Sequence, residues 1–228
     1  MPTIVPNLRD VGGMSTAAGS ALRHGAVLRS AMPAVGDSAP DGVAWPPSVV
    51  IDLRSVGELE SEHPLASGGA RIVNLPLLSA LRPGTPFATD LHGLYLLVLD
   101  HAALHLVELV REVSRAQGPA LIHCAAGKDR TGVSIALLLR LVDVPRDQVL
   151  TDYRATADAA EEIEARLGAI PGREHRSTLP VSFFEVSVEA LDGVLDVWDG
   201  HPEGVHGWFR SIGGNDDVIN QLRRTLVV

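Results

Sequence analysis

The sequence contains a single cysteine, Cys124, so it cannot form an internal disulfide bond. Zinc sites built from several cysteines are excluded for the same reason. No run of about 18 apolar residues occurs, so no integral membrane segment is expected. The N-terminus also lacks the basic start and apolar stretch of a cleavable signal peptide. We therefore expect a cytoplasmic protein, although export without a cleavable signal would leave no trace in the sequence.

Aromatic residues and positive charge are scarce as well. Aromatic side chains make up 4% of the 228 residues, so aliphatic side chains must fill most of the core. The hydrophobic content of 46% is too high for a disordered chain. The formal net charge of −9 argues against a nucleic-acid-binding protein and against a polybasic membrane anchor. A substrate with several negative charges would need a local positive pocket.

Lysine is almost absent. Of the 19 basic residues, Lys128 is the only lysine and the other 18 are arginines. Such a bias replaces lysine wherever charge alone matters, whereas the two side chains are not interchangeable at a phosphate site. The one lysine that remains therefore marks its surroundings, residues 123–130, as a candidate site.

Short β-branched and apolar segments alternate with longer helical patterns. The predicted strands are residues 27–30, 49–53, 71–75 and 120–123. The predicted helices are residues 89–117, a buried helix at 131–142, and a helix from 145 to about 159. This alternation predicts an α/β fold with a central, mostly parallel sheet of four to five strands flanked by helices.

The expected organisation is a single domain over residues 1–228. Residues 1–160 would form the α/β core, and residues 161–228 would form a helical C-terminal extension, because helical patterns there alternate with Gly and Pro breaks.

Residues 123–130 connect a predicted strand to the predicted buried helix. Ligand sites of parallel α/β sheets lie at this position in the chain, at the carboxyl ends of the strands. Backbone N–H groups of a short loop and a helix N-terminus suit a phosphate dianion. Ala125 and Ala126 are small enough for the backbone to close around the anion, and Gly127 permits a positive φ.

Cys124 is the candidate nucleophile within this loop. A helix N-terminus and nearby cations favour the thiolate, which is the reactive form. Arg130 can bind two phosphate oxygens with its planar guanidinium group. Attack on phosphorus would give a phosphocysteine, which water would hydrolyse. His123 is expected to orient the loop, and Thr131 is expected either to donate to the thiolate as it leaves or to cap the helix.

The departing alkoxide or phenoxide needs a proton from a carboxylic acid. Asp129 in the loop is the favoured acid. Asp52, at the end of a predicted strand, is the second candidate, and Asp90 is a weaker one. Asp52 could instead form an ion pair with Arg54 or Arg130.

Other kinds of protein use similar loops. A binding module could recognise phosphate without turnover, but a loop that only binds would not need the cysteine, the arginine and the acid together, and all three candidates are present here. A sulfur transferase would leave the Arg-Thr-Gly sequence at the helix start unexplained. Arsenate reduction usually needs further cysteines to resolve the adduct, and this sequence has none.

The pattern His-Cys-x-x-Gly-x-x-Arg-Thr-Gly at residues 123–132 resembles the phosphate-binding signature of the protein tyrosine phosphatase superfamily. From the composition, the His, Gly and Arg would fall at these spacings from the cysteine by chance in about 3 of 10,000 cases. Ala-Gly-Lys-Asp-Arg-Thr-Gly at 126–132 resembles one branch, the bacterial tyrosine/serine phosphatases of the mycobacterial protein tyrosine phosphatase B type. Residues 7–13, and residues 52–55 with Glu58, match that branch as well.

The resemblance implies a phosphatase that works without metal or other cofactor. Its substrates would be phosphotyrosine proteins, with phosphoserine, phosphothreonine or phosphoinositides as further possibilities, and inorganic phosphate would be product and inhibitor. Lys128 followed by Asp129 matches the loop sequence associated with this broad and lipid-directed activity. Some members carry a helical lid, for which Glu161–Val188 is the candidate here. The Trp-Pro-Asp acid loop of the eukaryotic type is missing, which favours Asp129 as the acid.

Overall fold

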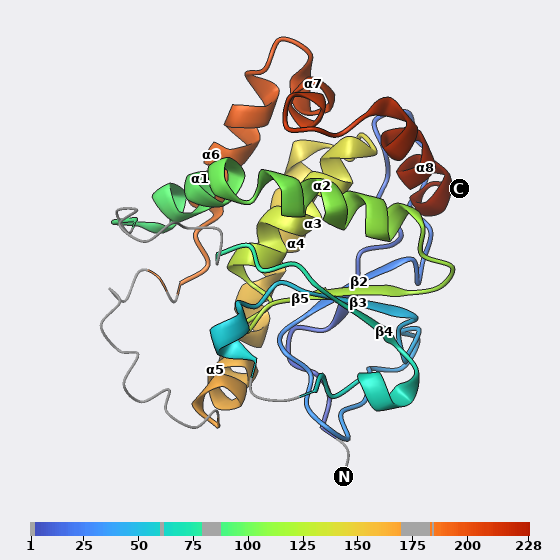
Figure 1. Cartoon of the computed structure of the whole chain (residues 1–228), viewed down its shortest axis with the longest axis vertical. Helices are drawn as coiled ribbons and strands as arrows, with labels where there is room; N and C mark the ends of the chain where they lie inside the picture. The colour runs from blue at the N-terminus through green and yellow to red at the C-terminus, as the bar shows by residue number, and fades with distance from the viewer. Residues whose placement is uncertain (1–2, 60–61, 79–87, 170–182, 184) are drawn as a thin grey trace.

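The computed structural model of the chain describes residues 3–59, 62–78, 88–169, 183 and 185–228 (Figure 1). Its strands are β1 (Arg9–Asp10), β2 (Val27–Ser30), β3 (Val49–Asp52), β4 (Arg71–Asn74) and β5 (Ala120–His123). They form one sheet in the order β1-β2-β5-β3-β4, in which only β1 runs antiparallel to its neighbour. The predicted α/β fold with a mostly parallel sheet is therefore confirmed.

All four predicted strands are present, and β2 and β5 have the predicted ends. The glycine-rich segment 7–13 contains a further strand, β1, which is not among the predicted strands. Arg9 and Asp10 pair with β2, whose edge would otherwise leave backbone groups unpaired. A two-residue strand of polar residues has no alternating pattern from which it could be predicted.

The strand register brings polar residues together at the carboxyl edge of the sheet. His123 of the central strand β5 lies level with Ser30 of β2 and with Asp52 of β3. The chain leaves β5 at this edge and enters the candidate loop. The sheet therefore places the loop between the ends of two neighbouring strands.

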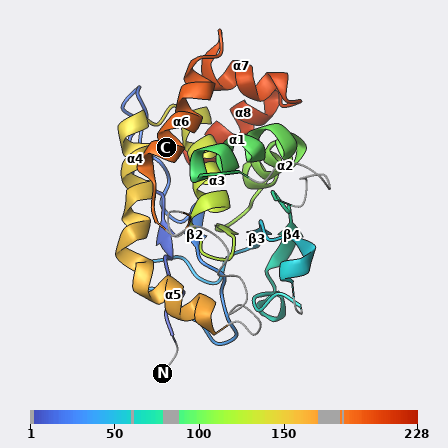
Figure 2. The same ribbon diagram turned by 90° about the vertical axis from the view of Figure 1, so that its left-hand side faces the viewer.

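The α-helices lie above and to the left of the strands in Figure 1, and Figure 2 shows the same arrangement from the side. The described helices are α1 (Leu91–His101), α2 (Ala103–Ser114), α3 (Asp129–Leu141), α4 (Arg146–Arg154), α5 (Ala160–Gly168), α6 (Val188–Asp199), α7 (Gly204–Ser211) and α8 (Asp216–Leu226), with short 3-10 turns at Val56–Glu58, Ala66–Gly68 and Ala155–Ala159.

Helix α3 is the buried helix that the sequence predicts, and it starts two residues earlier than expected. Eleven of its 13 residues are buried, and it contacts α1, α2, α4, α6 and α7. Burying an aliphatic side chain contributes about 1.5–3 kcal/mol, so this helix is strongly anchored. Its N-terminus, which follows the candidate loop, is correspondingly fixed.

The helix predicted over residues 89–117 is two helices. α1 and α2 meet at Ala102 with a bend of 78°. Ala102 is buried and leaves the helical conformation, with φ −106° and ψ 16°. The two helices pack against different elements: α1 packs on α6, and α2 packs on α8. No single helix in the described ranges has the length and apolar composition of a membrane span, and α1 and α2 reach both only when taken together.

The C-terminal helices belong to the main hydrophobic core. Trp198 of α6 and Phe209 of α7 are fully buried, and the rings of Trp198 and Trp208 lie 5.4 Å apart. These side chains join one cluster with residues of the sheet and of α3. Of the predicted lid Glu161–Val188, residues 170–182 and 184 lie outside the described ranges, so the lid stays a prediction.

Candidate active site

The candidate loop is a tight connection between β5 and α3. Gly127 has φ +66°, the conformation that glycine adopts without strain. A Cβ at this position would lie 2.2 Å from the carbonyl oxygen of Ser30. Position 127 therefore requires glycine for two reasons: its positive φ and the close approach of the loop to β2.

Two side chains from the N-terminal part of the chain donate hydrogen bonds to carbonyl groups in the second half of the loop. The Asn7 side-chain amide donates to the carbonyl oxygens of Gly127 at 3.0 Å and of Ala126 at 3.4 Å. Arg29, which is fully buried in β2, donates to the Gly127 oxygen at 2.9 Å. Arg29 is itself paired with the buried carboxylate of Asp152. These contacts turn the carbonyl groups of Ala126 and Gly127 away from the inside of the loop.

The first two carbonyl groups of the loop are held in the same way. The Cys124 oxygen accepts from Nδ1 of His123 at 3.0 Å. The Ala125 oxygen accepts from the backbone N–H of Met32 at 3.0 Å. His123 therefore orients the loop as predicted, through its own ring.

The outward carbonyl groups determine where the amides point. The C=O and N–H of one planar trans peptide unit point in opposite directions. The N–H groups of Ala125, Ala126, Gly127 and Lys128 therefore face the inside of the loop. Within the described ranges, none of these four amides donates to another residue. They are the convergent donors that a phosphate dianion requires.

Arg130 is fixed by Glu58, the last residue of the 3-10 turn Val56–Glu58. Nη1 and Nη2 of Arg130 donate to the two carboxylate oxygens of Glu58 at 2.6 and 3.0 Å. Burial opposes charge on both groups, but their mutual hydrogen bonds raise the pKa of Arg130 and lower the pKa of Glu58. Nη1 also donates to the carbonyl oxygen of Leu53 at 3.3 Å.

These contacts leave one edge of the guanidinium group for a ligand. A guanidinium group has five N–H donors. Glu58 and Leu53 use both hydrogens of Nη1 and one of Nη2. The Nε hydrogen and the second Nη2 hydrogen of Arg130 lie on one edge, and in the described ranges no residue accepts from them. That edge can donate two parallel hydrogen bonds to phosphate oxygens.

Cys124 and Thr131 are both buried. Cys124 is 2% exposed and directly follows β5, at the start of the loop. The Thr131 hydroxyl has no hydrogen-bond partner in the described ranges. Neither of its predicted contacts is therefore present, and the helix N-cap is Lys128, whose side chain does not cap.

Asp129 stands at the start of α3 with its side chain about a quarter exposed (25%). Its Oδ1 accepts from the Tyr95 hydroxyl at 2.7 Å and lies 2.9 Å from Nζ of Lys128. Lys128 also donates to the carbonyl oxygens of Phe183 at 3.1 Å and Glu185 at 2.7 Å. The lysine thus ties the loop to the segment before α6.

Asp52, the second candidate acid, is ion-paired with Arg54. Nε of Arg54 lies 3.0 Å from Oδ1, and Nη2 lies 2.7 Å from Oδ2. Asp52 is 2% exposed. Burial alone would raise its pKa, but His123 and the hydrogen bonds of Arg54 hold the pKa below its ordinary value. The carboxylate is therefore kept ionised.

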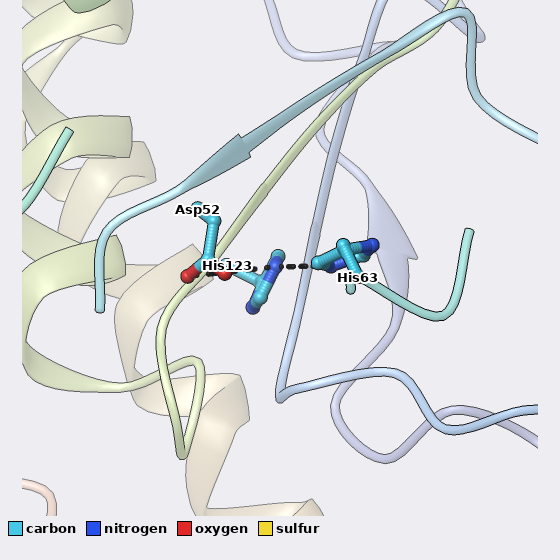
Figure 3. A group of neighbouring side chains, drawn as sticks. All are labelled: Asp52, His63 and His123. Carbon is cyan, nitrogen blue, oxygen red and sulfur yellow. Dashed lines mark hydrogen bonds and ion pairs between the residues drawn. The ribbon is translucent and has the colours of Figure 1, made fainter. Parts of the chain in front are cut away.

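A second histidine, His63, lies next to His123, on the side opposite Asp52 (Figure 3). Nε2 of His63 is 2.9 Å from Nε2 of His123. His123 must carry its hydrogen on Nδ1, because the Cys124 oxygen can only accept. Its Nε2 is then the acceptor and His63 is the donor. Nδ1 of His63 in turn accepts from the Leu65 N–H at 3.1 Å, so every ring nitrogen is satisfied with both rings neutral.

Asp52, His63 and His123 offer three possible metal ligands within 4.8 Å of one another. Their donor atoms are already committed, however. A metal on Nε2 of His63 would require a hydrogen on Nδ1, where the Leu65 N–H already points. The carboxylate of Asp52 is held by Arg54. The chemistry of this group suits a hydrogen-bonded chain better than a metal ion.

The sheet, the loop at its carboxyl edge and the anchored arginine together define an α/β phosphatase. A sequence profile described as tyrosine phosphatase family matches residues 3–228. The chain therefore belongs to the tyrosine phosphatase family.

Three relatives from bacteria support this assignment. A provisionally named tyrosine-protein phosphatase of Cupriavidus necator is 28% identical over 91% of this chain and 81% of its own length. The triple specificity protein phosphatase PtpB of Mycobacterium tuberculosis is 31% identical over 55% of this chain and 49% of its own length. A tyrosine-protein phosphatase of Nostoc commune is 28% identical over 61% of this chain and 50% of its own length. The last two matches span about half of those relatives.

Proposed function

We propose that this chain hydrolyses phosphate monoesters through a phosphocysteine intermediate on Cys124. The observation that carries the proposal is that the carbonyl groups of residues 124–127 accept hydrogen bonds outward, so the N–H groups of residues 125–128 point into the loop. With the open edge of Arg130, they form a site for a dianion on a protein of net charge −9. The site is organised before a ligand arrives, which is what electrostatic stabilisation of a transition state requires.

The reaction has two steps. The Cys124 thiolate attacks phosphorus, the bond from phosphorus to the leaving oxygen breaks, and the leaving oxygen takes the proton of Asp129. Water then attacks the phosphocysteine, Asp129 takes a proton from that water, and inorganic phosphate leaves with the thiolate restored. Arg130 and the loop amides hold the equatorial oxygens throughout.

Two features support Asp129 over Asp52 as the acid. Asp52 is almost fully buried, and Arg54 contacts both of its carboxylate oxygens. Asp129 is partly exposed and both of its described contacts use one oxygen, so the other is left for a proton.

The proposed substrate is phosphotyrosine in proteins, with phosphoserine, phosphothreonine or phosphoinositides as further substrates. The triple specificity in the name of the Mycobacterium tuberculosis relative supports this breadth, and so does Lys128 followed by Asp129 within the loop. Inorganic phosphate would act as product and inhibitor. The composition favours the cytoplasm as the place of action.

The test is phosphate release from phosphotyrosine peptides, phosphoserine and phosphothreonine peptides, and phosphoinositides. Cys124→Ser should abolish release from all of them while the fold and phosphate binding remain. Asp129→Asn should slow release strongly. Turnover by Cys124→Ser would contradict the mechanism. Tight phosphopeptide binding by the unchanged protein without any release would favour a phosphate-reading binding module instead.

A further inference from the structure

The two tyrosines of the chain form a row of hydrogen bonds, called here the tyrosine line, which runs from Tyr153 through Tyr95 to the carboxylate of Asp129. Tyr95 projects from α1 and Tyr153 from α4, and each is 1% exposed. Their hydroxyl oxygens are 2.6 Å apart, and the Tyr95 hydroxyl is 2.7 Å from Oδ1 of Asp129. Side chains from two helices that are far apart in the sequence thus meet at the start of α3.

The direction of these hydrogen bonds follows from their ends. An ionised carboxylate can only accept, so Tyr95 donates its single hydrogen to Asp129. Tyr153 must then donate to the oxygen of Tyr95. Burial and the charge of Asp129 raise the pKa of Tyr95 well above its ordinary value, and burial raises that of Tyr153. Both hydroxyls therefore stay protonated, and each stays a donor.

The tyrosine line is held in place by packing. The Tyr153 ring lies directly against Gly132 of α3, where an added Cβ would come within 2.7 Å of a ring carbon. A glycine one turn into the helix allows this approach, so the ring is fixed against the same helix that begins with Asp129.

Lys128 contacts the same carboxylate oxygen as Tyr95. Its Nζ is 2.9 Å from Oδ1. With two donors on Oδ1, the proton of the acid form belongs on Oδ2. We infer that Tyr95 and Tyr153 are positioning residues that fix the rotation of the Asp129 carboxyl group and present its Oδ2 proton to the leaving oxygen, which rests on the proposed role of Asp129 as the acid.

The inference predicts a dependence on the leaving group. A strongly acidic phenol departs as phenoxide without a proton, whereas a weakly acidic phenol needs one from Oδ2 as the bond to phosphorus breaks. Loss of the positioning hydroxyls should therefore matter little for the first substrate and strongly for the second. A purely structural role of the tyrosines would slow both substrates equally.

The experiment measures kcat/KM for a series of aryl phosphates from dinitrophenyl to phenyl phosphate. With phenyl phosphate, Tyr95→Phe should lose about tenfold, Tyr153→Phe about threefold, and Asp129→Asn about a hundredfold or more. With dinitrophenyl phosphate the tyrosine variants should lose less than about twofold. Ser114→Ala is the matched control, because it also deletes a buried hydroxyl, which donates to the Arg111 carbonyl at 2.8 Å. It should not change the leaving-group dependence.

The outcomes separate this inference from the proposed function. A steeper leaving-group dependence for Asp129→Asn and for both tyrosine variants supports the inference. A steeper dependence for Asp129→Asn alone overturns the inference and leaves the acid role intact. An unchanged dependence for Asp129→Asn overturns both. If Tyr95→Phe does not fold, Tyr153→Phe decides, since it keeps the direct contact and removes only the second link.

Discussion

Replacement of His63 by glutamine should make the protein more resistant to mild acid. His63 is 8% exposed and donates to His123. Burial, followed by the neighbouring His123, lowers its pKa from 6.5 to about 4, and Arg54 acts in the same direction while Asp52 opposes it. Between these two pH values the unfolded chain binds a proton at His63 that the folded protein does not bind. The contribution of neutral His63 to the free energy of unfolding is therefore fully present above pH 6.5 and is lost as the pH falls towards 4.

The two pKa values set the size of the effect. One unit of pKa difference corresponds to about 1.4 kcal/mol, so the full loss is about 3 kcal/mol. Between pH 7 and pH 5 the loss is about 2 kcal/mol. Glutamine does not titrate, yet it offers an N–H donor for His123 and an oxygen acceptor for the Leu65 N–H. His63→Gln thus removes the proton site and keeps the hydrogen-bond pattern.

The assay is urea unfolding at pH 7, 6 and 5 for the unchanged protein and for His63→Gln. The free energy of unfolding should fall more steeply with decreasing pH in the unchanged protein, by about 2 kcal/mol over this range. The depressed pKa values of Asp52, Glu58 and Asp152 act at lower pH and are common to both proteins. Equal pH slopes for the two proteins would refute the assigned neutral, hydrogen-bonded histidine pair.

Three substitutions test the loop itself. Gly127→Ala should abolish phosphate release, because its Cβ would meet the Ser30 carbonyl at 2.2 Å; near-normal turnover would contradict the described loop, and circular dichroism checks the fold. Glu58→Gln should raise KM for an aryl phosphate about tenfold, because the charged anchor of Arg130 becomes neutral; an unchanged KM would show that the anchor is dispensable. Asn7→Ala should lower kcat/KM about fivefold through loss of the hydrogen bond to the Gly127 oxygen, with Arg29 still in place; a drop in the unfolding temperature without loss of activity would assign Asn7 to stability alone.

Local pattern was sufficient to predict β2 to β5 and the loop, but not β1. Short β-branched or apolar runs mark β2 to β5, and β2, β3 and β5 are buried along their whole length, as parallel strands covered on both faces require. The motif around Cys124 places the loop between strand and helix. The break at Ala102 has no such signal, since alanine favours a helix and only the different partners of α1 and α2 bend the chain there.

The supporting side chains were not predictable in the same way. Glu58, Tyr95 and Asn7 act on the loop across 72, 34 and 120 residues of sequence, respectively. Asn7 and Glu58 belong to stretches that resemble the family, but the resemblance does not say which atoms they contact. For Tyr95, the scarcity of tyrosine in the sequence is a signal that could have been used, because the chain has only two tyrosines and both lie at this site.

The hydrogen bonds from Asn7 to the loop also have a consequence for folding. They join atoms 119 and 120 residues apart, and the Met32 contact with Ala125 is similarly distant. Contacts between such distant positions close large loops and are generally slow to form. The loop amides should therefore turn inward only after the N-terminal segment has docked. During refolding, the first appearance of phosphate binding would report the time at which the N-terminal segment docks against the loop that follows the central strand β5.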